Sequence, residues 1–390
     1  MNRTAKFLDH YILKRRNTML GVGPMSKNCV DATIEISNQY KVPIFLIASR
    51  RQIECESLGG GYCNNWNTEQ LSKYVSSKDK KNMIILSRDH GGSFQGNPDI
   101  EKKNNYKKTL LQAKESFKID IDSNFKIIHI DTSYGLNKEI PKKKSMNMLF
   151  ELYSFVCNYS KKQKKKILIE IGTEEQTGNT NSFKELDNFL NIIFKFCLKN
   201  KFQKPTFVVI QSGTKVMETR NVGIFESPVR IKGEIPVEIQ LFKVLEICKK
   251  YHIFMKEHNA DYLTNDSLKW HPKIGVHAAN VAPEFGVAET KAFVEILKKN
   301  NQKKILDEFL QLSYNSYKWK KWILNLSLHN NDYEKSIIAG HYVFSSKSFL
   351  DMKKKLSKNL SVSVQEIDIS LKNSIKKSIL RYIYNFGLVS

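Results

Sequence analysis

The sequence has few of the features that mark a secreted, membrane-bound or zinc-finger protein. Its six cysteines form no CxxC pair and no zinc-ribbon spacing, so we expect buried free thiols in a reducing compartment. No apolar run approaches the roughly 18 residues of a membrane-spanning helix, and the N-terminal segment is charged rather than apolar. No internal repeat or low-complexity tract is present. These absences predict a cytoplasmic protein without a signal peptide or membrane span.

Acidic residues are also scarce relative to basic ones. Lys and Arg number 63 against 39 Asp and Glu, a formal net charge of +24. Such an excess would suit nucleic acid or an anionic substrate. The lysines, however, lie in short runs on stretches with a helical pattern, at 142–144, 164–166 and 353–355. We therefore favour solvated helix faces and do not expect nucleic acid as the partner.

The chain can bury a large core, since 41% of its 390 residues are hydrophobic. Nearly continuous apolar runs, typical of strands buried on both faces, alternate with amphipathic stretches. The predicted strands span 20–26, 42–49, 82–89, 125–132, 166–172, 206–213, 252–258 and 274–280. The predicted helices between and after them span 28–40, 68–75, 106–117, 146–159, 183–198, 237–251 and 287–299.

Regular alternation of strand and helix predicts parallel pairing with right-handed crossovers. A count of eight such units over about 300 residues favours a (β/α)8 TIM barrel, with a doubly wound open sheet as the competitor. The strand signal stops after residue 300. We therefore predict a barrel over 1–300 and a helical C-terminal extension over 301–390.

Polar residues cluster at the C-terminal ends of the predicted strands. In a (β/α)8 barrel this rim carries the catalytic groups, and a buried charge there is costly unless it is paired or bound to a metal. Such residues at five strand ends favour an active site over structural polar pairs. They are Arg88, Asp89, His90, His129, Asp131, Glu170, Glu174, Glu175, Glu257, His258, His277 and Asn280.

Histidine and carboxylate groups without cysteine suit a divalent metal, with zinc preferred and manganese as the alternative. We predict His90, Glu170 and His258 as its ligands. His129 and His277 are reserves that could instead orient substrate or lie in the core. Asp89 directly precedes His90, and neighbouring strand residues point to opposite sides. One of the two can therefore face the metal while the other meets the substrate as the strand ends, which makes Asp89 the candidate for proton transfer.

Glycine-rich segments follow the same rim, at 59–61, 91–92 and Gly213. Such loops let backbone N–H groups approach phosphate oxygens, although a glycine triplet is about as often a plain turn. Because Lys215 and Lys273 lie nearby in sequence, we favour a phosphosugar over a neutral sugar as the substrate.

Seven segments of the chain resemble one known family. The sequence resembles the Z-type subunit of class II D-tagatose-1,6-bisphosphate aldolase over about residues 18–300, and more loosely in its tail. RQIECESLGGGY at 51–62 resembles that family's GGY loop, and KEHNADYLTND at 256–266 is the most specific match. The others are RDHGG at 88–92, HIDTS at 129–133, IEIGTEEQTG at 169–178, VVIQSGTKV at 208–216 and KIGVHAANVAPEFGVAET at 273–290.

The resemblance implies a (β/α)8 barrel in carbohydrate metabolism, acting on ketose phosphates. It implies Asp89 as the proton-transferring acid and His90, Glu170 and His258 as metal ligands. Glu175, after the fifth strand, is added as a second catalytic candidate. The predicted substrate-binding residues are Gln52, Gly60, Gly61, Asp131, Gly213, Lys215, Asp261, Lys273 and His277.

One departure keeps three functions open. Catalytic class II aldolases carry a metal-binding histidine after the sixth strand, where this chain has QSGT at 211–214. The Z-type subunits share that departure and are accessory partners of a catalytic subunit. The resemblance thus implies an oligomer and leaves three alternatives. These are an aldolase component, a metal-dependent 4-epimerase of a ketose phosphate or hexuronate, and a purely stabilising partner of a catalytic aldolase subunit.

Overall fold

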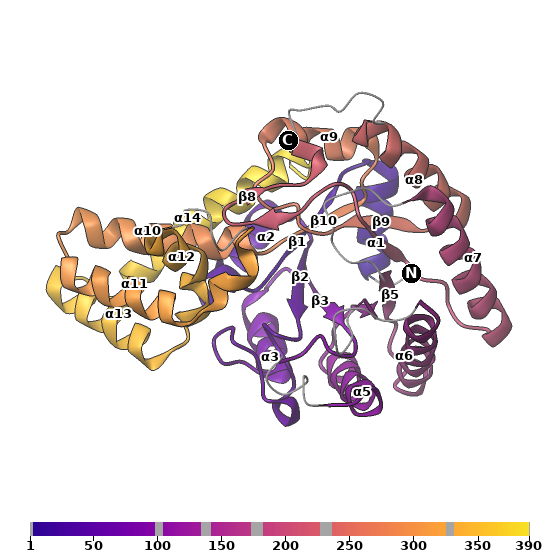
Figure 1. Ribbon diagram of the computed structural model, residues 1–390, viewed down its shortest axis with the longest axis horizontal. Helices are drawn as coiled ribbons and strands as arrows, with labels where there is room; N and C mark the ends of the chain where they lie inside the picture. The colour runs from indigo at the N-terminus through magenta and orange to yellow at the C-terminus, as the bar shows by residue number, and fades with distance from the viewer. Residues whose placement is uncertain are drawn as a thin grey trace.

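Eight parallel strands close into a barrel in the computed structural model (Figure 1). It describes residues 3–97, 104–133, 142–172, 182–226, 236–324 and 331–389. The strand order around the barrel is β1-β10-β9-β6-β5-β4-β3-β2, and β1 pairs in parallel with both β10 and β2. That closure confirms the predicted (β/α)8 TIM barrel and excludes the open sheet.

Each barrel strand falls inside or within two residues of a predicted one. The sequence reveals them because most of their residues are buried on both faces. The strands are β1 (Met19–Val22), β2 (Ile44–Ser49), β3 (Ile84–Gly91), β4 (Ile127–Asp131), β5 (Leu168–Gly172), β6 (Phe207–Ile210), β9 (Phe254–Glu257) and β10 (Ala278–Val281). A short antiparallel hairpin, β7 (Val216–Met217) with β8 (Arg220–Asn221), follows β6 and was not predicted.

Four barrel helices, α2, α3, α5 and α9, begin at a residue whose side chain accepts one of the free N–H groups. Ser26 caps α2, and Asn67 and Gln70 form a capping box on α3. Two helices were not predicted, the short α1 and α9, and in α9 Pro272 interrupts the pattern. The helices to this point are α1 (Arg3–Leu8), α2 (Lys27–Tyr40), α3 (Thr68–Lys78), α5 (Tyr106–Asp122), α6 (Lys142–Lys162), α7 (Phe183–Asn200), α8 (Val237–Tyr251), α9 (Asn265–Ile274) and α10 (Pro283–Lys299). Short turns of other types are η1 (Asp9–Lys14), η2 (Glu56–Leu58) and η3 (Ile224–Glu226).

The C-terminal helices form a lobe beside the barrel, at the left of Figure 1. They are α11 (Lys303–Asn315), η4 (Lys318–Trp322), α12 (Asp332–Ala339), η5 (Gly340–Val343), α13 (Lys347–Leu360) and α14 (Val364–Asn385). Helix α14 returns along α2 and α10, so Ile375, Ile379 and Ile383 join an apolar cluster of the barrel. The helical character of 301–390 agrees with expectation, whereas a domain boundary at residue 300 stays a prediction.

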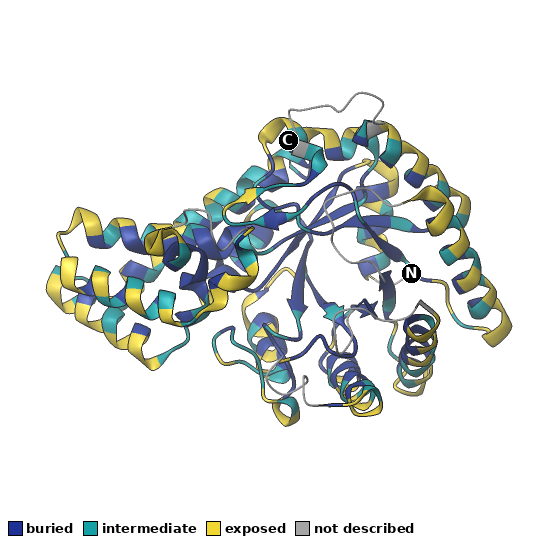
Figure 2. Ribbon diagram, in the orientation of Figure 1, coloured by how far each residue is buried: buried dark blue, intermediate teal, exposed yellow. Residues whose placement is uncertain are grey.

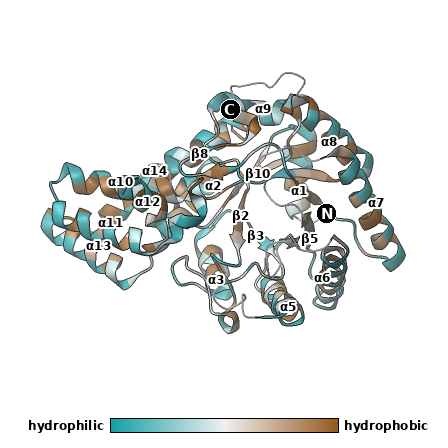
Figure 3. Cartoon of the chain, in the orientation of Figure 1, coloured by the Kyte–Doolittle hydropathy of each residue, from teal (hydrophilic) through white to brown (hydrophobic). Residues whose placement is uncertain are grey.

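The barrel interior is filled by aromatic rings in its lower half. Phe45 on β2 and Phe207 on β6 belong to strands on opposite sides of the barrel, yet their ring centroids are 6.0 Å apart. Phe254 on β9 contacts Phe207 at 5.6 Å. Figure 2 shows the strands buried and the outer helix faces exposed, and Figure 3 shows the matching apolar strands and polar outer faces. These rings close the N-terminal end of the barrel, which leaves the C-terminal end for a site.

No helix in the described part of the chain is long and apolar enough to cross a membrane. All six cysteines are buried and free, as predicted.

Candidate functional site

A cluster of four buried polar side chains lies above the aromatic layer. Asp89 on β3, His129 on β4, Glu170 on β5 and His258 after β9 each offer a ligand atom, and these atoms all lie within 4.8 Å of one another. Strand alternation explains the meeting, because every second residue of a barrel strand points inward. On β3, β4 and β5 an inward apolar residue precedes each polar one by two or four positions, so both point into the barrel. The apolar residues are Ile85, Ile127 and Leu168. The cluster therefore follows from strand register.

The spacing of these atoms suits a tetrahedral ion. Ligands about 2.1 Å from zinc stand about 3.4 Å apart in a tetrahedron. His258 Nε2 lies 3.4 Å from Glu170 Oε1 and 3.6 Å from Asp89 Oδ1. His129 Nδ1 lies 3.7 Å from Glu170 Oε1 and 3.8 Å from Asp89 Oδ1. These four of the six atom pairs lie at spacings close to those of a zinc site, and two imidazoles with two carboxylates are donors that suit zinc or manganese.

The protonation states of three members also favour a metal. Burial raises the pKa of Asp89, but His90 and His258 outweigh it and hold this pKa well below its usual range. Burial likewise opposes ionisation of Glu170, and nearby Lys256 and His129 lower its pKa to about 2. Burial lowers the pKa of His258. Two ionised carboxylates and a neutral imidazole at neutral pH are what metal ligation requires.

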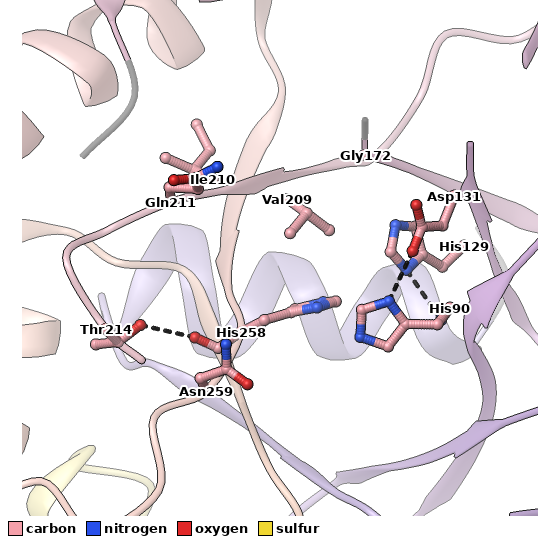
Figure 4. A pocket seen from close by; sticks show the side chains of 10 residues that line it. All are labelled: His90, His129, Asp131, Gly172, Val209, Ile210, Gln211, Thr214, His258 and Asn259. Atoms are coloured by element: carbon pink, nitrogen blue, oxygen red, sulfur yellow. Dashed lines mark hydrogen bonds and ion pairs between the residues drawn. The ribbon is translucent and has the colours of Figure 1, made fainter. Parts of the chain in front are cut away.

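His90 turns toward the same space because β3 is irregular at this point. The register between β3 and β4 shifts between Arg88 and Gly91, and His90 adopts a left-handed φ of 43°. Its Nδ1 donates to Asp131 Oδ2 at 2.7 Å, while its Nε2 lies 3.8 Å from Asp89 Oδ2. In Figure 4 the rings of His90 and His258 lie side by side in an edge-to-face arrangement, with centroids 4.9 Å apart. Both Asp89 and His90 therefore face the site, and the bulge makes this possible.

Asp131 is held rigidly on the far side of His90. Gln95 Nε2 donates to its Oδ2 at 2.8 Å, and Ser133 donates to its Oδ1 through both N and Oγ. Burial opposes its ionisation, yet the bond to His90 lowers its pKa to about 2. Asp89 and Asp131 together overcome the effect of burial and raise the pKa of His90 to about 9. Asp131 thus fixes the orientation of the His90 ring and leaves Nε2 facing the site.

His129 has a fixed tautomer and an unused donor. Its Nδ1 accepts the backbone N–H of His90 at 3.2 Å, so the proton of the neutral ring lies on Nε2. This buried Nε2 has no hydrogen-bond partner in the described chain. It faces Gly172 at the end of β5, where an added Cβ would lie 2.8 Å from it. A bound ion would have to replace the His90 N–H at Nδ1, and a substrate oxygen could accept from Nε2.

A narrow recess opens above these groups at the C-terminal end of the barrel. The Thr214 hydroxyl donates to the His258 carbonyl at 2.8 Å, which ties the loop after β6 to the site (Figure 4). The recess is lined by His90, His129, Asp131, Gly172, Val209, Ile210, Gln211, Thr214, His258 and Asn259. Gln211 thus occupies the lining at the end of β6, where catalytic class II aldolases carry a histidine.

The structure places three predicted substrate-binding residues in the loop after β2. Gln52 uses its amide locally: Oε1 accepts from Ser49 N, and Nε2 donates to Met25 Sδ. Gly60 has a φ of 65°, and a Cβ on Gly61 would lie 2.0 Å from the Gln52 carbonyl oxygen. The two glycines therefore serve loop closure, and none of the three lines the recess.

Three others lie near the rim in structural roles. Gly213 is buried with a φ of 85° beside the hairpin, and the Lys215 N–H donates to Asn221 Oδ1. Asp261 Oδ1 accepts the N–H groups of Ala282 and Glu284, so it caps α10. Burial raises the pKa of Asp261 to about 7.

Two predicted residues lie away from the cluster. His277 directly precedes β10, at the N-terminal end of the barrel, and its Nδ1 accepts the Met255 N–H at 3.0 Å. Lys273 is exposed near the end of α9, with its ammonium 5.4 Å from the Trp270 ring. The end-of-strand argument misplaced His277 because β10 begins later than predicted. Glu175, the second catalytic candidate, and Glu174 lie outside the described residues.

Sequence reasoning missed Lys256 and underrated Asn280 and His129. Lys256 Nζ lies 2.7 Å from Glu170 Oε2, and Asn280 Nδ2 donates to Asp89 Oδ1 at 3.1 Å. Strand alternation could have indicated that all three side chains point into the barrel. Lys256 lies two residues before His258, and Asn280 lies on β10.

Comparisons with known proteins support the fold. No protein-family model matches the sequence, and no curated protein matches it. A probable tagatose 6 phosphate kinase from Sinorhizobium meliloti 1021 is similar in structure, with a TM-score of 0.68 at 14% identity, covering 94% of this chain and 100% of that one. A fructose-bisphosphate aldolase from Campylobacter jejuni gives 0.58 at 12% identity, covering 99% and 94%. The fructuronate-tagaturonate epimerase UxaE from Cohnella laeviribosi gives 0.56 at 9%, covering 95% and 81%. This chain therefore shares its fold with aldolase and epimerase structures.

Proposed function

We propose that the chain is a metal-dependent enzyme component of carbohydrate metabolism that catalyses reversible retro-aldol cleavage of a ketose phosphate. The four-donor cluster at the base of the recess carries this proposal, because its spacing suits one divalent ion. The sequence resemblance to class II tagatose-bisphosphate aldolase supplies the reaction class. A divalent ion held by His129, Glu170, His258 and Asp89 would supply Lewis-acid polarisation of the ketose carbonyl.

The remaining chemistry belongs to side chains of this chain. His90 presents Nε2 to the recess while Asp131 holds Nδ1, so its ring is oriented for a proton or hydrogen bond at a substrate hydroxyl. Asp89 Oδ2 lies 3.8 Å from that Nε2, beyond hydrogen-bond distance, so the two groups flank the place for a substrate hydroxyl. Asp89 would take the C4 hydroxyl proton, and the protonated His90 ring would donate a hydrogen bond to substrate oxygen. His129 Nε2 offers a hydrogen bond to oxygen charge that develops during cleavage.

One feature favours an accessory role as the second candidate. Gln211 lines the recess where catalytic relatives of the resembled family have a histidine. On that alternative the chain would act with a catalytic class II aldolase subunit. A ketose 4-epimerase would use the same cleavage and re-form the bond after the aldehyde fragment turns.

A product assay on the purified chain separates these functions. The chain is incubated with zinc or manganese and a panel of ketose phosphates and hexuronates, and the products are followed by NMR and coupled triose-phosphate detection. Triose release supports the aldolase, and a C4 epimer supports the epimerase. Activity only after addition of a class II aldolase subunit supports the accessory role. No product under any of these conditions would contradict the proposal.

A further inference from the structure

Lys256 lies directly beneath the donor cluster. It precedes His258 by two residues and points to the same side of β9, into the barrel. Its Nζ is 2.7 Å from Glu170 Oε2, and both side chains are only 1% exposed. This is an ion pair within the barrel, between the candidate metal site and the aromatic layer.

The surroundings of the ammonium offer it no other anion. Its Nζ lies 5.3 Å from the centroid of the Phe45 ring and 5.7 Å from that of Phe207. No second carboxylate pairs with it in the described part of the chain. Burying an unpaired ammonium or carboxylate is costly, so Lys256 and Glu170 each depend on the other when no ion is bound.

Lys256 is poorly placed to react with substrate itself. The recess is lined by residues above Glu170, and Lys256 is not among them. A Schiff base would require this amine to leave Glu170 and cross the donor cluster. An electrostatic role is therefore the better account of its position.

The two oxygens of Glu170 face two different positions for a positive charge, the ammonium of Lys256 and the proposed ion. Its Oε2 faces Lys256, whereas its Oε1 lies 3.4 Å from His258 Nε2 and faces the donor cluster. An ion at the cluster would meet two carboxylates, with the lysine charge one carboxylate away. The lysine thus keeps Oε1 oriented toward the cluster and also neutralises part of the charge that attracts the ion.

We propose that Lys256 is an internal counter-cation of the metal site, which stabilises the metal-free barrel and weakens metal binding in return. The inference rests on the proposed metal site. Because lysine and ion share Glu170, a bound ion substitutes for the charge of Lys256. Removing the lysine should then harm the protein mainly when the ion is absent.

The test compares metal affinity and stability in three variants. Lys256→Met removes the charge, and Lys256→Gln removes it while keeping a donor for Glu170. Lys304→Met, at an exposed position of α11, is the matched control on the surface. Zinc and manganese affinities are measured by equilibrium dialysis, and Tm is measured with and without the ion.

We expect both Lys256 variants to bind zinc at least tenfold more tightly than wild type. Their Tm should fall without the ion and recover toward the wild-type value when it is saturating. The control should match wild type throughout. Recovery of folded protein only in the presence of the ion would also support the proposal.

Three results would overturn it. Unchanged or weaker affinity in folded Lys256 variants, with wild type still binding, removes the counter-cation role but leaves the metal site intact. Failure of both variants to fold even with the ion means that the ion cannot replace the lysine. No binding by any protein removes the metal site itself, and the inference with it.

Discussion

The Nδ1 of His90 lies 2.7 Å from the Oδ2 of Asp131, across the irregular junction of β3 and β4. This bond decides which nitrogen of His90 faces the recess. It resembles the carboxylate–histidine pairs that orient catalytic and metal-binding imidazoles elsewhere.

Replacing Asp131 by Asn should lower turnover about 10–100-fold, because the amide no longer fixes the ring of His90. Steady-state rates on the ketose phosphate found by the product assay check this. Ser133→Ala is the control: it removes a hydroxyl bond to the other oxygen of Asp131 and should change the rate less than about threefold. An Asp131→Asn enzyme with the wild-type rate would show that the pair is structural.

Gly172→Ala should reduce ion affinity and turnover at least about tenfold by displacing the His129 ring. The added Cβ would lie 2.8 Å from His129 Nε2 and 3.1 Å from Val209 Cβ. Equilibrium dialysis with zinc provides the measurement. The double variant with Val209→Ala relieves only the second contact, so it should remain defective. If the double variant regained the wild-type ion affinity, the steric contact with Val209 would be the cause of the defect, and the role given to His129 would be wrong.

The buried Glu289 should make stability depend on pH. Burial raises its pKa to about 7, against the bonds from Ser26 and Asn28, while the neighbouring groups Asp368 and Lys353 act in opposite directions. Because the folded-state pKa exceeds the unfolded one, its stabilising contribution is complete below about pH 4.5 and is lost as pH rises through 7.

Glu289→Gln should therefore flatten the fall in unfolding free energy between pH 5 and 8, on the order of 2 kcal/mol. Urea unfolding at several pH values measures this. The buried thiols of Cys29 and Cys63, which also interact with Glu289, titrate only above this range because burial raises their pKa. A slope identical to that of wild type would contradict the prediction.

Tyr382→Phe should destabilise the protein by about 1–2 kcal/mol, because it removes a buried hydrogen bond to a carboxylate. The Tyr382 hydroxyl donates to Glu284 and to the Ala260 carbonyl, and Arg381 pairs with the same glutamate at 2.9 Å. These bonds fasten α14 to the start of α10, beside the segment that follows His258. Tyr384→Phe, at an exposed position of the same helix, is the control and should cost little. If urea unfolding showed the same loss of unfolding free energy for both variants, the hydrogen bonds of Tyr382 would not be what fastens α14 to α10.

The fold was readable from the sequence because its signal is local. Eight apolar runs mark the strands, and polar residues at their ends locate the functional face. The end-of-strand argument named Asp89, Glu170 and His258, which inward register brings together. It gave Asp89 the proton-transfer role and His90 the third ligand position, whereas Asp89 lies in the group of four and His90 lies beside it.

What escaped prediction depends on backbone detail and on three-dimensional proximity. The left-handed conformation of His90 cannot be read from residue types, so its ring direction was open. Lys256 resembles any surface lysine in this lysine-rich sequence. Its burial appears only once β9 is placed beside β6, where the ammonium lies close to the rings of Phe45 and Phe207. His277 was misjudged because the start of β10 decides which end of the barrel it occupies.

The most direct test of the central claim is equilibrium dialysis of the purified chain against zinc and manganese. The wild type is compared with His129→Ala and His258→Ala, and His277→Ala at the other end of the barrel is the matched control. We predict one ion per chain in wild type and in the control, with affinity reduced at least about tenfold in the two site variants. Absence of a bound ion in wild type, or equal binding by all four proteins, would contradict a metal centre at this cluster.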